Sequence, residues 1–290
     1  MARIMLFGAT GTIGRAAHAA LLSEGHEVHA PERGADFAKR MKEVRPEVVM
    51  SCLASRTGTP ADAEAVDHLL NAAILGAAVP AGVQHFILLS AICVQRPLLG
   101  FQKAKLAFEA KLRAAPMMGT IVRPTAFFKS LSGQVERLRA GKPFLLFGDG
   151  TLTACKPISD GDLGRYLAKC VVDTSLQGRV LPIGGPGPAI TPREQGAMLF
   201  EALGLTPKFR QVPVALLSTI ITALRLFGLR DKAELAKIGR YYATESMLVW
   251  DGARYDADAT PEFGTETLAQ HYARLARGHV EDQRGAHAVF

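Results

Sequence analysis

The residues Arg3-Ile-Met-Leu-Phe7 and Gly8-Ala-Thr-Gly11-Thr-Ile-Gly14 decide how the chain begins to fold. A short apolar run that stops at a glycine is typical of a buried parallel strand. The glycines follow the spacing G-x-x-G-x-x-G, and apolar residues over 12–24 recur at roughly helical spacing. The sequence therefore predicts a strand, a tight glycine-rich turn and a helix in direct succession, as in a dinucleotide-binding unit.

Strands and helices continue to alternate along the first half of the chain. We expect strands at 26–30, 47–51, 85–90 and 120–122, and helices at 35–44, 61–80 and 101–115. Alternation with short connections indicates parallel βαβ units, and right-handed crossovers then make the sheet doubly wound. The expected fold class is α/β, with a Rossmann-like doubly wound parallel sheet and a smaller C-terminal substrate-binding region.

Beyond about residue 125 the pattern changes to Gly- and Pro-rich loops between short strands and helices. We therefore expect a dinucleotide-binding Rossmann domain over residues 1–125 and a mainly substrate-binding region over residues 126–290. Part of that region, near 160–185, is expected to return to the Rossmann sheet, with Val180–Ile183 as its strand.

Composition excludes several classes of protein. The 290 residues are 48% hydrophobic and 21% charged, which supports a full core and excludes a disordered chain. The net charge of +7 is spread without a basic stripe, so we expect no nucleic-acid partner. The four cysteines lack metal-ligand spacing, and we expect no metal site. The first strand begins at residue 3 and no apolar run reaches the roughly 18 residues of a membrane span, so we expect a cytoplasmic protein without a targeting segment.

The glycine-rich turn has the features of a nicotinamide-dinucleotide site. Gly8 permits the tight turn, Gly11 lets the backbone approach the pyrophosphate, and Gly14 lets the helix pack close to the strand. The pyrophosphate is then expected at the helix N-terminus, where the amides and the helix dipole favour an anion. The residues expected to bind the cofactor are Gly8, Thr10, Gly11, Thr12, Ile13, Gly14, Arg15, Arg33 and Lys105.

The end of the second predicted strand discriminates between the two nicotinamide dinucleotides. An acidic residue there binds the ribose hydroxyl of NAD, whereas an arginine accommodates the 2′-phosphate of NADP. Glu32 and Arg33 stand side by side at this place, and Arg15 follows the third glycine. Two guanidinium groups that converge on a phosphate favour NADPH, and Glu32 leaves NAD as the alternative.

The catalytic position departs from that of the short-chain dehydrogenases. Those enzymes serve the nicotinamide with a serine and with Tyr-x-x-x-Lys on the helix after the fourth strand. Ser90 and Lys105 stand at the places of the serine and the lysine, but Phe101 replaces the tyrosine. A carbonyl reductase needs an O–H donor for the developing alkoxide. The phenylalanine therefore favours reduction of a C=C bond or no catalysis at all, and we expect Lys105 to hold the nicotinamide ribose.

Several longer segments of the sequence identify a protein family more specifically than the three glycines do. They are Ser51–Gly58, Leu88–Gln95, Pro97–Leu99, Phe101–Glu109, Ile121–Leu131, Phe147–Gly150, Ala154–Ser159, Leu181–Pro186 and Gly239–Leu248. Along nearly the whole chain they resemble the NADPH-dependent 8-vinyl reductases of divinyl chlorophyllides and protochlorophyllides, which are atypical short-chain dehydrogenases near the NmrA-like proteins. The connection between the second and third strands is shorter than is usual in that family, so its adenine contacts are not carried over.

The resemblance implies an oxidoreductase of chlorophyll and bacteriochlorophyll biosynthesis in photosynthesis, which reduces the C8 vinyl group of a Mg-chlorin or Mg-porphyrin to ethyl. Hydride addition to the outer vinyl carbon leaves charge that the macrocycle delocalises, so no phenol is required. Lys105, Ser90 and Cys93 are the candidate catalytic residues, and Tyr241, Tyr242 and water are further candidates for the proton donor. The residues expected to bind the substrate are Phe101, Phe127, Phe128, Tyr241 and Tyr242. An apolar slot for the macrocycle is expected from Phe127, Phe128, Leu131 and the segment 214–227.

Two other functions stay open at this point. One is a non-catalytic NADP-binding regulator of the NmrA type, which also lacks the tyrosine. The other is a different C=C or quinone reductase of the atypical short-chain dehydrogenases. The positive charge and the apolar segment 214–227 also allow loose contact with the surface of a photosynthetic membrane. The sequence does not indicate the oligomeric state.

Overall fold

The structure is a computed structural model, and it describes residues 1–32 and 34–278. The chain divides into two compact units. The first unit comprises residues 1–55, 60–124 and 160–183, and the second comprises residues 56–59, 125–159 and the chain from 184 onward.

The first unit is built on a six-stranded sheet in the order β2-β1-β3-β4-β5-β7. Its strands are β1 Arg3–Phe7, β2 Glu27–His29, β3 Val48–Ser51, β4 His85–Leu89, β5 Met118–Pro124 and β7 Val180–Ile183. Every neighbouring pair is parallel, which confirms the predicted α/β class with a doubly wound sheet. β5 continues through Pro124 instead of ending at Val122, because Arg123 and Pro124 still lie in register with β7.

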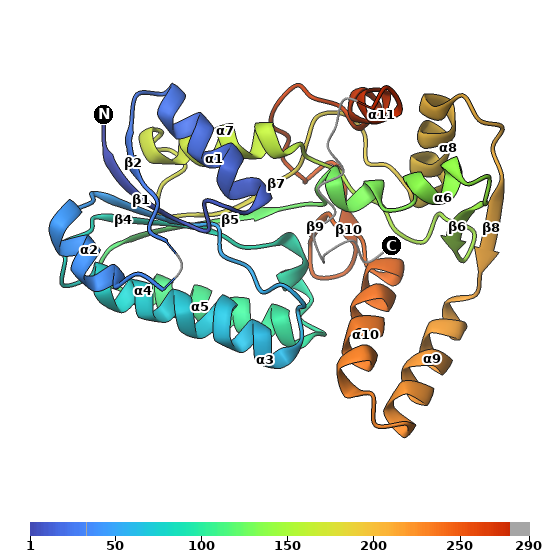
Figure 1. The fold of residues 1–290 in the computed structure, drawn as a ribbon, viewed down its shortest axis with the longest axis horizontal. Coiled ribbons are helices and arrows are strands. Elements are labelled where there is room, and N and C mark those ends of the chain that lie inside the picture. Colours follow the sequence, from blue (N-terminus) through green and yellow to red (C-terminus); the bar gives the residue numbers. More distant parts are fainter. Residues whose placement is uncertain (33, 279–290) are drawn as a thin grey trace. The chain divides into compact units, whose positions relative to one another are not determined.

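Helices cover both faces of this sheet (Figure 1). They are α1 Thr12–Ser23, α2 Phe37–Val44, α3 Pro60–Ala63, α4 Asn71–Ala78, α5 Gly100–Ala114 and α7 Asp160–Val172, with the π-helix η1 Glu64–Leu70 and the 3-10 helix η2 Ile92–Gln95. α1 and α7 lie on one face, and α2, α4 and α5 lie on the other (Figure 1). A Cβ atom on Gly164 of α7 would lie 2.6 Å from the carbonyl carbon of Ala16, so this glycine permits the close packing of α7 on α1.

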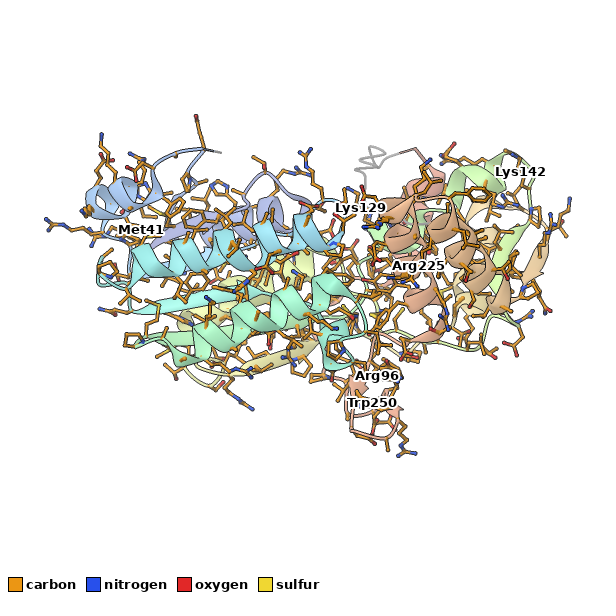
Figure 2. The ribbon with its side chains drawn as sticks, turned by 90° about the horizontal axis from the view of Figure 1, so that it is seen from below. Met41, Arg96, Lys129, Lys142, Arg225 and Trp250 are labelled. Carbon is orange, nitrogen blue, oxygen red and sulfur yellow. The ribbon has the colours of Figure 1, made fainter. Side chains whose placement is uncertain are left out.

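Buried apolar side chains join the sheet to its helices. Met41 of α2, labelled in Figure 2, is fully buried together with Val49 of β3. The rings of Phe86 in β4 and Phe108 in α5 pack with their centroids 5.7 Å apart. β3 and β4 are buried along their whole length, as the continuous apolar runs of the sequence predict for central parallel strands.

The second unit has smaller sheets and its own core. Its elements are η3 Lys129–Ser132, α6 Val135–Arg139, β6 Phe144–Phe147, α8 Pro192–Leu203, β8 Phe209–Val212, α9 Val214–Leu226, α10 Arg230–Thr244, β9 Val249–Trp250, β10 Tyr255–Asp256 and α11 Leu268–Ala276. β6 pairs with β8 in parallel, and β9 pairs with β10 in antiparallel orientation. Phe144, Leu199 and Tyr272 are among the side chains of its core.

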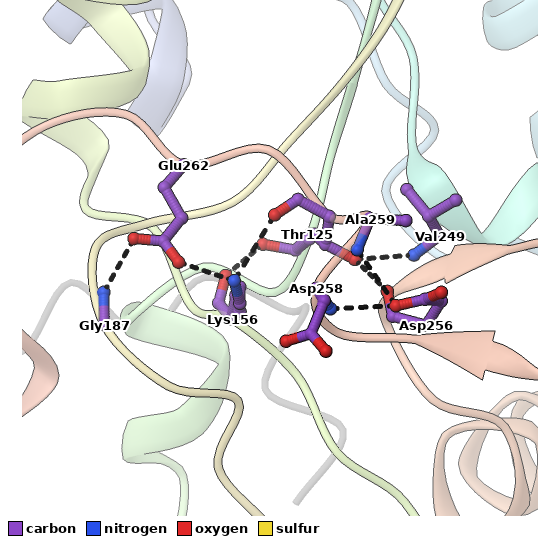
Figure 3. Close-up of polar contacts among 9 residues, drawn as sticks. Thr125, Lys156, Gly187, Val249, Asp256, Asp258, Ala259 and Glu262 are labelled. Atoms are coloured by element: carbon purple, nitrogen blue, oxygen red, sulfur yellow. Dashed lines mark hydrogen bonds and ion pairs between the residues drawn. The ribbon is translucent and has the colours of Figure 1, made fainter.

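A buried lysine links distant loops of the second unit (Figure 3). The Lys156 ammonium lies 2.5 Å from Glu262 Oε1 and donates to the carbonyl of Thr260 at 3.4 Å. Glu262 also accepts from the Gly187 amide at 3.2 Å, and Thr125 donates its hydroxyl to the Lys156 carbonyl. The ion pair therefore fixes the segment around Glu262 to the loop that carries Lys156.

Candidate functional site

The glycine-rich turn leaves bare backbone at the start of α1. Gly8 has φ +79°, and its carbonyl accepts from the Gly11 amide at 3.0 Å. A Cβ on Gly14 would lie 2.0 Å from the Gly8 carbonyl oxygen, and a Cβ on Gly8 would lie 2.8 Å from the carbonyl of Cys52. Backbone thus approaches backbone at both positions, which side chains would prevent.

The N-terminus of α1 has the polarity that an anion requires. Gly11 is the N-cap and has no side chain with which to cap the helix, and the first turn carries no acidic residue. The first-turn amides and the helix dipole therefore act on whatever lies beyond the turn. The Arg15 guanidinium donates to the carbonyl of Thr10, which holds a positive charge beside the same turn. This donor set fits a pyrophosphate.

The predicted partners of the 2′-phosphate are only partly described. Arg33 lies outside the described residues. Glu32 is exposed, and its carbonyl accepts from the Ala35 amide at 3.1 Å. The expected preference for NADPH over NADH therefore rests on the sequence.

Ser90 follows β4 directly, and its hydroxyl hydrogen-bonds to a buried carboxylate. The Oγ atom donates to Glu109 Oε1 at 2.6 Å, and Arg123 Nε donates to the same oxygen at 3.1 Å. Glu109 is fully buried on α5. A serine has one proton to donate, and here Glu109 accepts it. The sequence reasoning missed Glu109 because its partners are 14 and 19 positions away.

Lys105 lies on α5 and forms an ion pair with a residue that the sequence reasoning also missed. Its Nζ atom lies 2.7 Å from Asp67 Oδ1, and both side chains are buried or nearly so. The Ser55 amide donates to the same Asp67 oxygen at 3.4 Å. Asp67 sits in a segment that the sequence predicted only as an Ala-rich helix. The one available signal was an aspartate and an asparagine, Asp67 and Asn71, four residues apart on one helix.

Two further predicted residues of the first unit are buried. Cys93 lies in η2, where its carbonyl accepts from Gln102 Nε2 at 3.0 Å. Phe101 lies in the first turn of α5. The turn after β1, the loop after β3 and Ser90 after β4 all lie at the carboxyl ends of parallel strands, which is where such sheets bind ligands.

The predicted substrate-binding residues of the second unit differ in their surroundings. Phe128 is 2% exposed, and its ring centroid lies 5.3 Å from that of His271, so it belongs to the core of the unit. Phe127 is half-buried and Tyr242 is exposed, whereas Tyr241 is buried. The two tyrosine rings pack edge to face, with centroids 5.7 Å apart. Phe127 and Tyr242 are therefore better placed than Phe128 to line an apolar slot for a substrate in this unit.

Residues 1–32 and 34–278 contain neither a cluster of metal ligands nor a membrane-spanning helix. No group of three or more His, Cys, Asp or Glu side chains there is placed to hold a metal ion. None of the helices in this part of the chain combines the length and the apolar character that crossing a membrane requires.

Comparison with known proteins agrees with a nicotinamide site. A family model described as NAD(P)H-binding matches residues 31–174. The fold resembles that of an NADPH-dependent quinone oxidoreductase from Escherichia coli, solved with NADPH, at a TM-score of 0.68 and 17% identity. That likeness covers 94% of this chain and 99% of the other. It shows the fold alone.

Similarity in sequence is much higher to plant proteins. A chloroplastic divinyl chlorophyllide a 8-vinyl-reductase from Zea mays is 42% identical, over 99% of this chain and 82% of its own length. The protein of the same name from Cucumis sativus is 49% identical, over 84% of this chain and 61% of its own length.

Proposed function

Because the chain belongs to the divinyl chlorophyllide a 8-vinyl-reductase family, we propose that it reduces the C8 vinyl group of a divinyl chlorophyllide or protochlorophyllide to ethyl with NADPH. The similarity to the maize reductase along nearly the whole chain carries the proposal. The glycine-rich turn and the N-terminus of α1 support it, since they fit the pyrophosphate of the cofactor.

The reaction adds one hydride and one proton across the vinyl double bond. The glycine-rich turn and the N-terminus of α1 would hold NADPH, which would supply the hydride for the outer vinyl carbon and become NADP⁺. The π electrons of the vinyl group then reside on the inner carbon and the conjugated ring, and the inner carbon takes up a proton. No oxyanion forms, so an O–H donor at Phe101 is not needed.

Among the candidate proton donors of the first unit, the Lys105 ammonium fits the role best. Cys93 is buried in η2, and the Ser90 proton is directed to Glu109. An ammonium has three N–H donors, and Asp67 accepts one of them. Lys105 is thus proposed to contact the nicotinamide ribose and to supply the proton.

The test is incubation of the purified protein with divinyl chlorophyllide and NADPH. We expect the Soret band to shift to shorter wavelength as conjugation shortens, with one NADPH oxidised for each pigment reduced. Binding of NADPH without any change of the pigment would instead indicate a regulator of the NmrA type. Oxidation of NADPH by a quinone, with the pigment unchanged, would indicate a different reductase.

Membrane contact is a second part of the proposal, and it rests on the turn between α9 and α10. Leu226 and Phe227 at this turn are 82% and 79% exposed. Arg225, labelled in Figure 2, and Arg230 are exposed on either side of them. Exposed apolar side chains flanked by cations suit the interface of an anionic membrane.

Sedimentation with vesicles tests the contact. We expect binding to phosphatidylglycerol vesicles and much weaker binding to phosphatidylcholine vesicles. Replacement of Leu226 and Phe227 by serine should abolish the binding. Leu205→Ser is the matched control, because Leu205 is an exposed leucine outside this turn. Equal binding of the double variant and the native chain would refute this part of the proposal.

A further inference from the structure

Residues 60–78 form a continuous helical stretch whose middle is a π-helix. α3 passes into η1 at Glu64, and η1 passes into α4 at Asn71. A π turn inside an α-helix is rare, because its hydrogen bonds span one residue more than those of the α-helix, and such turns are frequent at functional sites. Asp67 lies in the middle of this turn.

The side chain of Asn71 accounts for the widened turn. Its Nδ2 atom donates to the carbonyls of Val66 and Asp67, at 3.1 and 3.3 Å. Its Oδ1 atom accepts from the Ser51 hydroxyl at 2.6 Å. Ser51 ends β3 and pairs with Phe7, the residue before the glycine-rich turn. Asn71 therefore ties the π turn to the edge of the sheet where the proposed cofactor site begins.

The π turn presents the Asp67 carboxylate to Lys105. One oxygen lies 2.7 Å from the Lys105 Nζ atom, and the other is buried without a hydrogen-bond partner in the part of the chain that the structure describes. A buried carboxylate is stable only when it is paired. Asp67 therefore fixes the position of the Lys105 ammonium. The long lysine side chain no longer samples other rotamers.

We infer that Asp67 is a positioning residue for Lys105, which it holds ready to contact the nicotinamide ribose, and that Asn71 and the π turn set the place of Asp67. The inference rests on the proposed function only for the contact between Lys105 and the cofactor. Asp67 itself acts through Lys105, and the same chain of contacts joins Lys105 to the glycine-rich turn.

A double-mutant cycle in the dissociation constant of NADPH tests the inference, with NADPH fluorescence as the readout and no pigment present. We expect Asp67→Asn to weaken binding about tenfold, as expected for the loss of a charge-assisted contact. Lys105→Met should weaken binding by a similar factor. The variant with both changes should bind as Lys105→Met does, because Asp67 then has nothing to position. Losses that multiply in the double variant would overturn the inference.

Glu64→Gln is the matched control, because it makes the same carboxylate-to-amide change on η1 at an exposed residue that contacts His68. The affinity of Glu64→Gln for NADPH should equal that of the native chain. Asn71→Ala is a second route if Asp67→Asn fails to fold, and it should weaken binding a few-fold when Lys105 is present and not in Lys105→Met. An equal effect in both backgrounds would overturn the inference. The cycle measures NADPH binding without pigment. It therefore still tests the role of Asp67 if the protein proves not to reduce a vinyl group.

Discussion

The hydroxyl of Ser90 donates a hydrogen bond of 2.6 Å to the fully buried carboxylate of Glu109. Arg123 forms an ion pair with that carboxylate and donates to both of its oxygens. Ser90, Glu109 and the partly buried Arg123 thus form a connected group that joins the end of β4 to α5 and β5. From this arrangement we expect a structural role for Ser90 in place of the catalytic one that the sequence suggested.

Ser90→Ala should therefore lower stability more than activity. The change removes one donor from a buried carboxylate, which typically costs about 1–3 kcal/mol of the free energy of unfolding. The dissociation constant of NADPH and kcat should stay within a few-fold of the native values. Denaturant unfolding and steady-state kinetics measure the two effects. A hundredfold fall in kcat at native stability would show that Ser90 takes part in the chemistry.

Gly14→Ala should abolish NADPH binding. The new Cβ would lie 2.0 Å from the Gly8 carbonyl oxygen, so α1 and the turn must separate and the pyrophosphate site is lost. Gly76→Ala is the control, because its Cβ would meet nothing within 4 Å and its helical position favours alanine by about 0.5–1 kcal/mol. Titration of both variants with NADPH measures the difference. A native affinity of Gly14→Ala for NADPH would show that the glycine-rich turn is not part of the cofactor site.

Arg33→Ala should weaken NADPH far more than NADH. Loss of charge-assisted hydrogen bonds to the 2′-phosphate, worth about 1.5–3 kcal/mol, corresponds to about 10- to 150-fold in affinity. Fluorescence titration with each cofactor gives the two ratios. If the affinities for both cofactors fall equally, Arg33 does not bind the 2′-phosphate. Arg15→Ala should then lower the affinity for NADPH selectively.

We expect Glu262 to make the stability of the second unit depend on pH. The hydrogen bond from Lys156 holds the pKa of this carboxyl below its ordinary value of 4.5, and the Gly187 amide lowers the pKa further. A lowered pKa in the folded state stabilises above the unfolded pKa, and this stabilisation is lost as the pH falls through the folded value. Glu262→Gln should therefore lower the midpoint of urea unfolding at pH 7, and the difference from the native chain should vanish as the pH falls through the folded pKa of Glu262. A difference that is constant over this range would refute the assignment.

The sequence predicted the strands of the first unit and its longer helices up to residue 115 because their signals are local, whereas α7 and η2 were not predicted. The run Arg3–Phe7, the glycines after it and the periodicity of 101–115 each depend on neighbouring residues. The π turn was not predictable in this way, since it arises from Asn71 meeting Ser51 across the fold. Asp67 was missed for the same reason, because its partner Lys105 is 38 positions away.

The candidate site shows the same division. The turn at Gly8, Gly11 and Gly14 was identified from spacing, and the geometry explains Gly8 and Gly14. The aromatic residues proposed to bind the substrate were chosen by residue type alone. Residue type does not distinguish a ring in the protein core from one that lines a binding pocket. Phe128 packs on His271 in the core of the second unit, which only the tertiary structure reveals.

Transfer of isotope tests vinyl reduction most directly. The protein is incubated with divinyl chlorophyllide and NADPH that carries deuterium at the transferable position of the nicotinamide, and the product is analysed by mass spectrometry and NMR. We predict one deuterium on the terminal carbon of the new ethyl group, and in heavy water with ordinary NADPH one deuterium on the inner carbon. Recovery of the divinyl pigment unchanged, or of an ethyl group without cofactor deuterium, would contradict the proposed function.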